Sequence, residues 1–268
     1  MRSLSRALLA LVTAAALTGC INSTTLIKVN ADGSGTVEQT TLMNMAAVKS
    51  MMPGADKQMG GAVINKADLE RTAARMGKGV RLLSAEPATG ANGFTGTKAI
   101  FAFDDINQVQ VSQDPNMSGS TSGSFASEPK ADDPVRFSLS RSGSTSTLVV
   151  SLNDQPGGGG DQSQNPGDGP DLTNPAMMNM IKTMFQGAKI GINLEVAGSI
   201  VKTNAEYVTG SRITVLELDL ESLLADEAKF KALQSKLGPG ASLSEVKPYL
   251  RDIKGIKVDG PTIRVEFR

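Results

Sequence analysis

The chain has 268 residues with 27 basic and 27 acidic side chains, no histidine, no tryptophan and a single cysteine. The lack of histidine excludes a Ser-His-Asp triad and His/Cys zinc sites, and a lone cysteine excludes a disulfide within the chain. A balanced charge without a basic block, together with only 4% aromatic residues, argues against nucleic-acid binding and against aromatic stacking of sugars or bases.

The first 19 residues have the pattern of an export signal. Arg2 and Arg6 make a positive start, residues 7–17 are apolar, and two small residues stand directly before Cys20. The apolar stretch is too short for a permanent helical span of a bilayer, which needs about 20 residues. An ordinary secretory signal with a chance cysteine at its end is the alternative interpretation.

The sequence Leu17-Thr18-Gly19-Cys20 resembles the lipobox of bacterial lipoproteins. This resemblance implies cleavage before Cys20, diacylglycerol on its sulfur and usually a further acyl chain, such as palmitate, on the new amino terminus. Two or three acyl chains hold a protein durably on a membrane. Cleavage removes two arginines and leaves 249 residues with 25 basic and 27 acidic side chains and no free thiol.

The mature chain opens with a predicted hairpin. Residues 24–30 and 36–42 flank Asp32-Gly33, a dipeptide that tolerates positive φ and marks a hairpin turn. Helical spacing follows over residues 43–52, where Met45, Val48 and Met52 lie three and four apart.

Residues 66–76 are predicted as a helix, because Asn65 can cap it and apolar side chains recur on one face. Strand-like runs follow at 80–85, 93–103 and 109–111.

Two segments, 112–134 and 153–175, are rich in Gly, Ser, Pro, Asn and Asp and are predicted to be flexible loops. Between them, residues 135–152 alternate in polarity around Ser142-Gly143, which predicts a second hairpin.

The last third begins with a predicted methionine-rich helix over residues 176–186. The elements expected after it are strands at 189–196, 199–203 and 212–220, a helical turn at 221–224, a helix from Asp226 to Leu237, a helix at 243–252, and a final strand pair at 255–258 and 262–267.

Strands therefore occur mostly in adjacent pairs rather than singly between helices. This order predicts an α+β fold: a mainly antiparallel sheet built of hairpins, with helices packed on one face and two long disordered insertions. We expect a cleaved signal peptide at 1–19 and a single α+β domain over 20–268, with the flexible loops at 112–134 and 153–175.

Two stretches resemble a known family. TTLIKVNADGSGTVEQTTLMN, after the lipobox, and VAGSIVKTNAEYVTGSRITVLELDLESLLA, over 196–225, are similar to envelope lipoproteins with a domain like that of the mycobacterial lipoprotein LppM. The resemblance implies an α+β module anchored to a membrane, and it extends to the lipid binding proposed for that family. The matching positions are structural, so no functional residue carries over.

Two glycine-containing stretches have some features of ligand loops. Residues 30–35 offer one acid before the glycine and no Glu at the end of a loop, so a hairpin turn is favoured over a calcium site. Residues 157–160 have no accompanying Lys and no close helix, so a linker is favoured over a phosphate loop.

The predicted methionine-rich helix is the other candidate site. Five side chains share one of its faces: Met177, Met180, Ile181, Met184 and Phe185. Methionine is flexible and fills gaps in cores, so core packing is one explanation. An apolar groove for a lipid or a partner, and a Cu(I) site made of thioethers, are the alternatives.

Paired carboxylates occur at Asp104-Asp105 and at Glu217, Asp219 and Glu221. The second group alternates with leucines, as expected for a strand with one solvated face. Nothing in the sequence raises the pKa of one of these acids, as acid catalysis would require.

Together these features predict an exported bacterial lipoprotein of the cell envelope, without enzymatic activity, metal or cofactor. It would be anchored through acylated Cys20 and act as a binding or structural module for an envelope protein. The alternative is a lipid- or amphiphile-binding protein with a groove beside the methionine-rich helix. Because Ile21 and Asn22 rather than an aspartate follow Cys20, the outer membrane or its periplasmic face is expected in a Gram-negative host.

Overall fold

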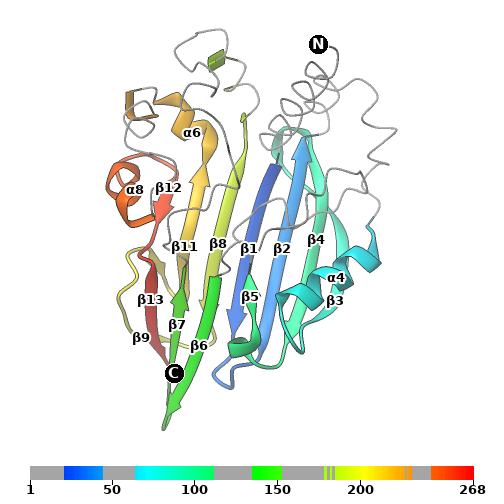
Figure 1. Cartoon of the computed structure of the whole chain (residues 1–268), viewed down its shortest axis with the longest axis vertical. Coiled ribbons are helices and arrows are strands. Elements are labelled where there is room, and N and C mark those ends of the chain that lie inside the picture. Colours follow the sequence, from blue (N-terminus) through cyan, green and yellow to red (C-terminus); the bar gives the residue numbers. More distant parts are fainter. Residues whose placement is uncertain are drawn as a thin grey trace, which may run out of the picture.

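Two β-sheets build the protein (Figure 1). The computed structural model describes residues 21–44, 64–111, 135–152, 178–179, 182, 185–226, 228–230 and 243–268. Within these residues the larger sheet has eight strands and the smaller sheet has five. In Figure 1 the strands of the larger sheet run roughly vertically through the middle of the view, and the smaller sheet lies over their lower part and extends below them.

The larger sheet has the strand order β10-β11-β8-β1-β2-β4-β3, and β12 also pairs with β11. β1 pairs in parallel with β8 and antiparallel with β2. The other pairs of this sheet are antiparallel. Its strands are β1 (Ile21–Val29), β2 (Gly35–Asn44), β3 (Arg81–Thr89), β4 (Phe94–Phe103), β8 (Lys189–Val196), β10 (Val208–Thr209), β11 (Arg212–Asp219) and β12 (Ile256–Val258).

The smaller sheet has the order β5-β6-β7-β13-β9 and is antiparallel throughout. Gly143 lies in the tight turn between the two longest strands of this sheet, which end at Ser142 and begin at Thr145. Its φ of 60° would strain a residue with a side chain. The strands are β5 (Gln110–Val111), β6 (Val135–Ser142), β7 (Thr145–Ser151), β9 (Ile200–Thr203) and β13 (Thr262–Phe267).

The chain passes from one sheet to the other several times, and two of these corners are held by backbone hydrogen bonds to the larger sheet. After β8, the N–H of Ala197 donates to the carbonyl of Val29 at 2.8 Å, and the chain then enters β9. After β12, the N–H of Asp259 donates to the carbonyl of Val215 at 3.0 Å, and the chain then enters β13. These corners place consecutive strands in different sheets, which closes the two sheets over a shared core.

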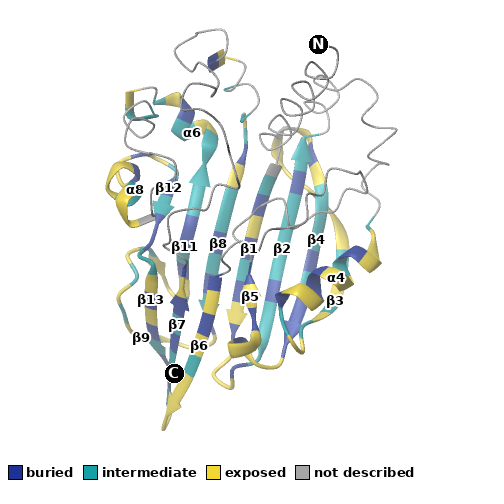
Figure 2. Ribbon diagram, in the orientation of Figure 1, coloured by how far each residue is buried: buried dark blue, intermediate teal, exposed yellow. Residues whose placement is uncertain are grey.

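The core lies where the two sheets overlap (Figure 2). Side chains from the facing surfaces of both sheets are fully buried there, as alternation along each strand requires. From the larger sheet come Ile27, Val37, Phe101, Leu194 and Ile213, and from the smaller sheet Val135, Leu148, Ile263, Val265 and Phe267.

Among the described residues, three α-helices have both ends defined: α4 (Lys66–Met76), α6 (Leu220–Ala225) and α8 (Leu243–Leu250). α4 contacts β3 and β5, and it buries Ala73 and Met76 in the shared core. Two 3-10 turns, η2 (Ala91–Gly93) and η3 (Ile106–Gln108), join strands or lead into them.

The α+β class and the mainly antiparallel hairpin construction are confirmed by the structure. Both predicted hairpins form, at 21–44 and at 135–151, and the helix at 66–76 has the predicted bounds and the predicted cap. The predicted loops at 112–134 and 153–175 lie outside the described residues.

Two predicted elements are corrected. Residues 255–258 and 262–267 do not pair with each other, because β12 joins β11 in the larger sheet while β13 joins β7 and β9 in the smaller one. The helix predicted from Met43 does not begin there, because Met43 and Asn44 pair with Thr95 and Phe94 as the end of β2. Residues 45–63 lie outside the described residues.

Candidate functional site

The position predicted to carry lipid, Cys20, lies just before the described residues, and β1 begins at the very next residue. Ile21 already pairs with Met43 of β2, and Asn22 pairs with Lys189 of β8. The predicted attachment point is therefore one residue from the backbone ladder of the larger sheet.

The strands of the larger sheet end at a common level beside Ile21. We define the anchor row as six residues at the ends of adjacent strands, which follow the register except for a step of one residue between Ile21 and Lys189, because Lys189 pairs with Asn22. In order across the sheet these are Thr89, Thr95, Met43, Ile21, Lys189 and Asp219. The row forms the upper end of the sheet in Figure 1.

The strand that starts beside Cys20 is central in this row. On one side of β1 lie β8, β11 and β12, and on the other side lie β2, β4 and β3. At a spacing of about 4.8 Å per strand, the row extends roughly 14 Å from β1 on the side of β3 and roughly 10 Å on the side of β11.

Only one of the five residues of the predicted methionine-rich groove, Phe185, is among the described residues, so the groove stays a prediction. Met177, Met180, Ile181 and Met184 lie outside the described residues. Phe185 is half-buried, and its carbonyl accepts a hydrogen bond from the N–H of Ala188 at 3.1 Å. A neighbouring methionine outside the predicted face, Met178, is 5% exposed.

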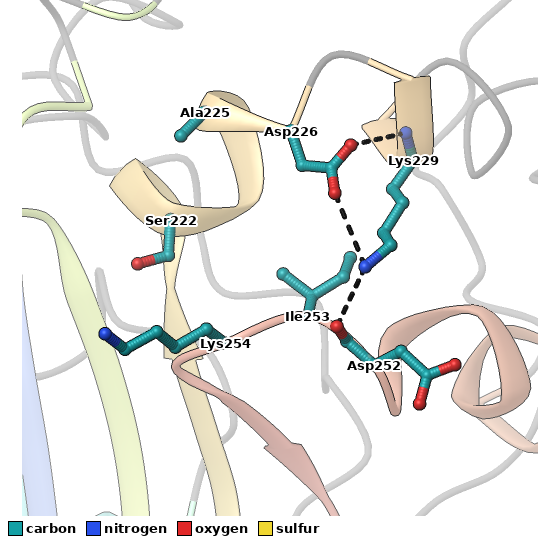
Figure 3. Close-up of a pocket in the computed structure, with 7 residues that line it drawn as sticks. All are labelled: Ser222, Ala225, Asp226, Lys229, Asp252, Ile253 and Lys254. Atoms are coloured by element: carbon teal, nitrogen blue, oxygen red, sulfur yellow. Dashed lines mark hydrogen bonds and ion pairs between the residues drawn. The ribbon is translucent and has the colours of Figure 1, made fainter.

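An open hollow of about 470 Å³ lies between α6 and the segment after α8. It is lined by Ser222, Ala225, Asp226, Lys229, Asp252, Ile253 and Lys254 (Figure 3).

Two of the four charged side chains that line this hollow, Asp226 and Lys229, contact each other. Lys229 Nζ lies 3.4 Å from Asp226 and donates to the carbonyl of Asp252 at 2.8 Å. The backbone N–H of Lys229 also donates to Asp226, and this bond lowers the pKa of the Asp226 carboxyl from its usual value. The hollow therefore presents a polar surface held together by its own contacts.

The carboxylates singled out in the sequence are paired in the structure. Glu217 binds Lys257 at 2.7 Å and Asp219 binds Lys189 at 3.2 Å, while Glu221 accepts from the N–H of Gly187 at 3.0 Å. Each of these acids therefore ties β11 or α6 to a neighbouring segment.

The other predicted acid pair serves turns at the opposite end of the sheet. Asp104 forms an ion pair with Arg81 at 2.8 Å, and Asp105 accepts from the N–H of Asn107 at the start of η3. Both interactions stabilise the segment that follows β4.

The Asp-Gly turn after β1 is a hairpin turn, as predicted. Asp32 accepts hydrogen bonds from the hydroxyl and the N–H of Ser34, and these bonds lower the pKa of its carboxyl. Gly33 has φ of 88° in this turn. Among the described residues, no group of three or more acidic or other metal-ligating side chains is placed to hold a metal ion.

Two acids, one buried and one bridging, were not predicted from the sequence. Asp259 is 2% exposed and accepts from the N–H groups of Glu206 and Gly260. Glu206 in turn binds Lys247 and Arg251 of the α8 region. The Asp-Gly-Pro sequence at 259–261 indicates a turn, but nothing local in it marks the turn as a corner between sheets.

No helix among the described residues is long and apolar enough to cross a membrane. No family model and no curated protein matches the sequence. An NMR structure of the folded domain of the LppM protein of Mycobacterium tuberculosis aligns with the chain at a TM-score of 0.37 and 12% sequence identity. The alignment covers 94% of this chain and 91% of that one. This is a distant similarity of fold, and no functional residue is transferred from it.

Proposed function

We propose that the chain is an exported bacterial lipoprotein, anchored by acylated Cys20, whose folded part is a non-enzymatic binding or structural module of the cell envelope. The observation that carries the proposal is the junction between the lipobox-like sequence and the fold. Leu17-Thr18-Gly19-Cys20 is followed without a spacer by β1, whose first residue, Ile21, is already paired. Cleavage before Cys20 would leave the complete strand intact and place the lipid at its start.

A binding or structural role is supported by how the polar side chains are used. Glu217, Asp219 and Asp226 are bound to lysines, and Glu221 is bound to a backbone N–H group. Catalysis requires an acid, base or nucleophile held ready for a substrate. These side chains instead hold segments of the fold together, which favours a module that acts through its surface.

The anchor is tested by fatty-acid labelling in the native host. Cells grown with an alkyne fatty acid should incorporate it into the wild-type chain and not into a Cys20→Ser variant. Ala91→Ser, at an exposed position in η2, is the matched control and should be labelled like the wild type. Unlabelled wild-type protein would contradict the proposal.

The role of the module is tested on the lipidated protein by native mass spectrometry and by crosslinking in intact cells. We expect a protein crosslink that is lost with the Cys20→Ser variant and no bound amphiphile. A reproducible adduct of lipid mass beyond the acyl groups on Cys20 would instead favour the amphiphile-binding alternative.

A further inference from the structure

The direct junction between Cys20 and β1 restricts where the folded part can lie relative to the membrane. Consecutive Cα atoms are about 3.8 Å apart, so Ile21 stays within roughly that distance of the acylated residue. Because Ile21 and Asn22 are held in the ladder with β2 and β8, they cannot fray into a tether without breaking that pairing.

The position of β1 within the sheet restricts tilting as well. A domain attached through an edge strand could swing away from the bilayer about that edge. Here β2, β4 and β3 lie on one side of the attachment point and β8 and β11 on the other, and the ends of these strands form the anchor row with Ile21. Tilting in the plane of the sheet in either direction would therefore press strand ends into the headgroups.

The charge of the anchor row identifies the kind of surface that it fits. Its two charged members, Lys189 and Asp219, neutralise each other at 3.2 Å, and the other four are uncharged. An uncharged row suits zwitterionic headgroups, whereas binding to anionic lipids relies on clustered Lys and Arg.

We infer that the end of the larger sheet that carries the anchor row, with α6 beside it, faces the membrane and that the larger sheet stands upright on the bilayer, with its strands along the bilayer normal. This inference rests on the proposed acylation of Cys20. The opposite end of the sheet, with the turn at 30–34, then lies about 27 Å farther from the membrane, since β1 rises about 3.4 Å per residue.

Two matched variants test the inference. Ala91→Cys lies in η2 beside the anchor row, and Ala31→Cys lies in the turn at the opposite end of the same sheet. Both positions are exposed alanines in turns, and acylation of Cys20 leaves the mature chain with no other free thiol, so each variant takes a single fluorescent label.

The labelled, lipidated full-length proteins are placed in phosphatidylcholine vesicles in which part of the lipid carries a nitroxide on its headgroup. Nitroxide quenching acts over short distances, so we expect it to be at least about threefold stronger at position 91 than at position 31, given their separation along the strands. A third variant inserts about 12 Gly and Ser residues between Cys20 and Ile21, a flexible spacer of roughly 20 Å. It should reduce quenching at position 91 towards the value at position 31.

The outcomes separate this inference from the proposed function. Equal quenching at the two positions, or stronger quenching at position 31, in protein whose mass shows acylation would overturn the upright arrangement and leave the anchor in place. A spacer without effect on quenching at position 91 would overturn it too. Protein without acyl groups would overturn both the inference and the proposed function.

Discussion

Asp259 is a buried carboxylate that acts at a corner of the fold. It is 2% exposed and accepts from the N–H of Glu206 at 3.0 Å and from that of Gly260 at 2.7 Å. Asp259→Ala leaves both donors of these partly buried hydrogen bonds without their partner, so we expect the free energy of unfolding to fall by about 1–3 kcal/mol. Urea denaturation followed by circular dichroism measures this change.

The control for this variant is Asp104→Ala. Asp104 is largely exposed and pairs with exposed Arg81, so its loss should change the unfolding free energy by less than about 0.5 kcal/mol. Equal effects of the two substitutions would contradict the role assigned to Asp259.

Glu206 links stability to pH. The hydrogen bond from Lys247 lowers the pKa of the Glu206 carboxyl below its usual value, and Arg251 adds to this effect. A carboxyl whose pKa is lower in the folded state stabilises the protein above its unfolded pKa, and this contribution is lost as the pH falls through the folded pKa. Glu206→Gln should therefore lower stability at neutral pH and make it fall less steeply below about pH 4.5.

Urea midpoints measured at several pH values between neutrality and mild acid provide this comparison. Glu70→Gln, which removes an exposed acid paired with Lys66 within one helix, serves as the control. If the wild type and the Glu206→Gln variant had parallel pH profiles, the Lys247 bond would not be significant in solution.

At the scale of single elements, α4 depends on the residue that caps its start. The Asn65 side chain accepts from the N–H of Ala67 at 3.1 Å and from that of Asp68 at 3.4 Å, which satisfies donors that the helix itself leaves without a partner. Asn65→Ala should destabilise the protein by about 1 kcal/mol. Asn65→Asp keeps an acceptor at the cap and should stay close to the wild type in the same urea titration.

The pairing of β2 with β4 requires a glycine at position 96. A Cβ there would clash with the Thr41 carbonyl oxygen and come within 2.9 Å of the Leu42 Cα. Gly96→Ala must separate the strands locally, and we expect a loss of about 2–3 kcal/mol, as for overpacking of a core.

Gly191→Ala is the matched substitution in β8 of the same sheet, where the nearest atom to a Cβ, Thr24 Cγ2, lies at 3.7 Å. It should change stability by less than about 0.5 kcal/mol. Similar losses for the two variants would indicate that Gly96 is required for some reason other than close contact.

Elements whose signals are local were predictable from the sequence. The Asn65 cap, the Asp32-Gly33 turn and the Gly143 turn each depend on the chemistry of a few neighbouring residues, and each forms as expected. The lipobox-like sequence is also a local signal, and the lipid attachment that it indicates stays a prediction.

For the whole molecule, the assignment of strands to sheets was not predictable in this way. β1 pairs with β8, which lies far along the chain, and the turn at 259–261 separates two strands instead of joining them. Turn residues specify a change of direction, whereas the choice of sheet depends on which buried faces pack together. For the same reason the anchor row, which depends on how six strand ends lie side by side, has no sequence signal of its own.

The intact mass of the protein extracted from the membrane of its native host tests the central claim most directly. We predict the mass of residues 20–268 increased by a diacylglyceryl group and a further acyl chain, with fragment ions that place both on Cys20. The unmodified mass of the 268-residue chain, or of a chain that begins at any other residue, would contradict the proposed anchor.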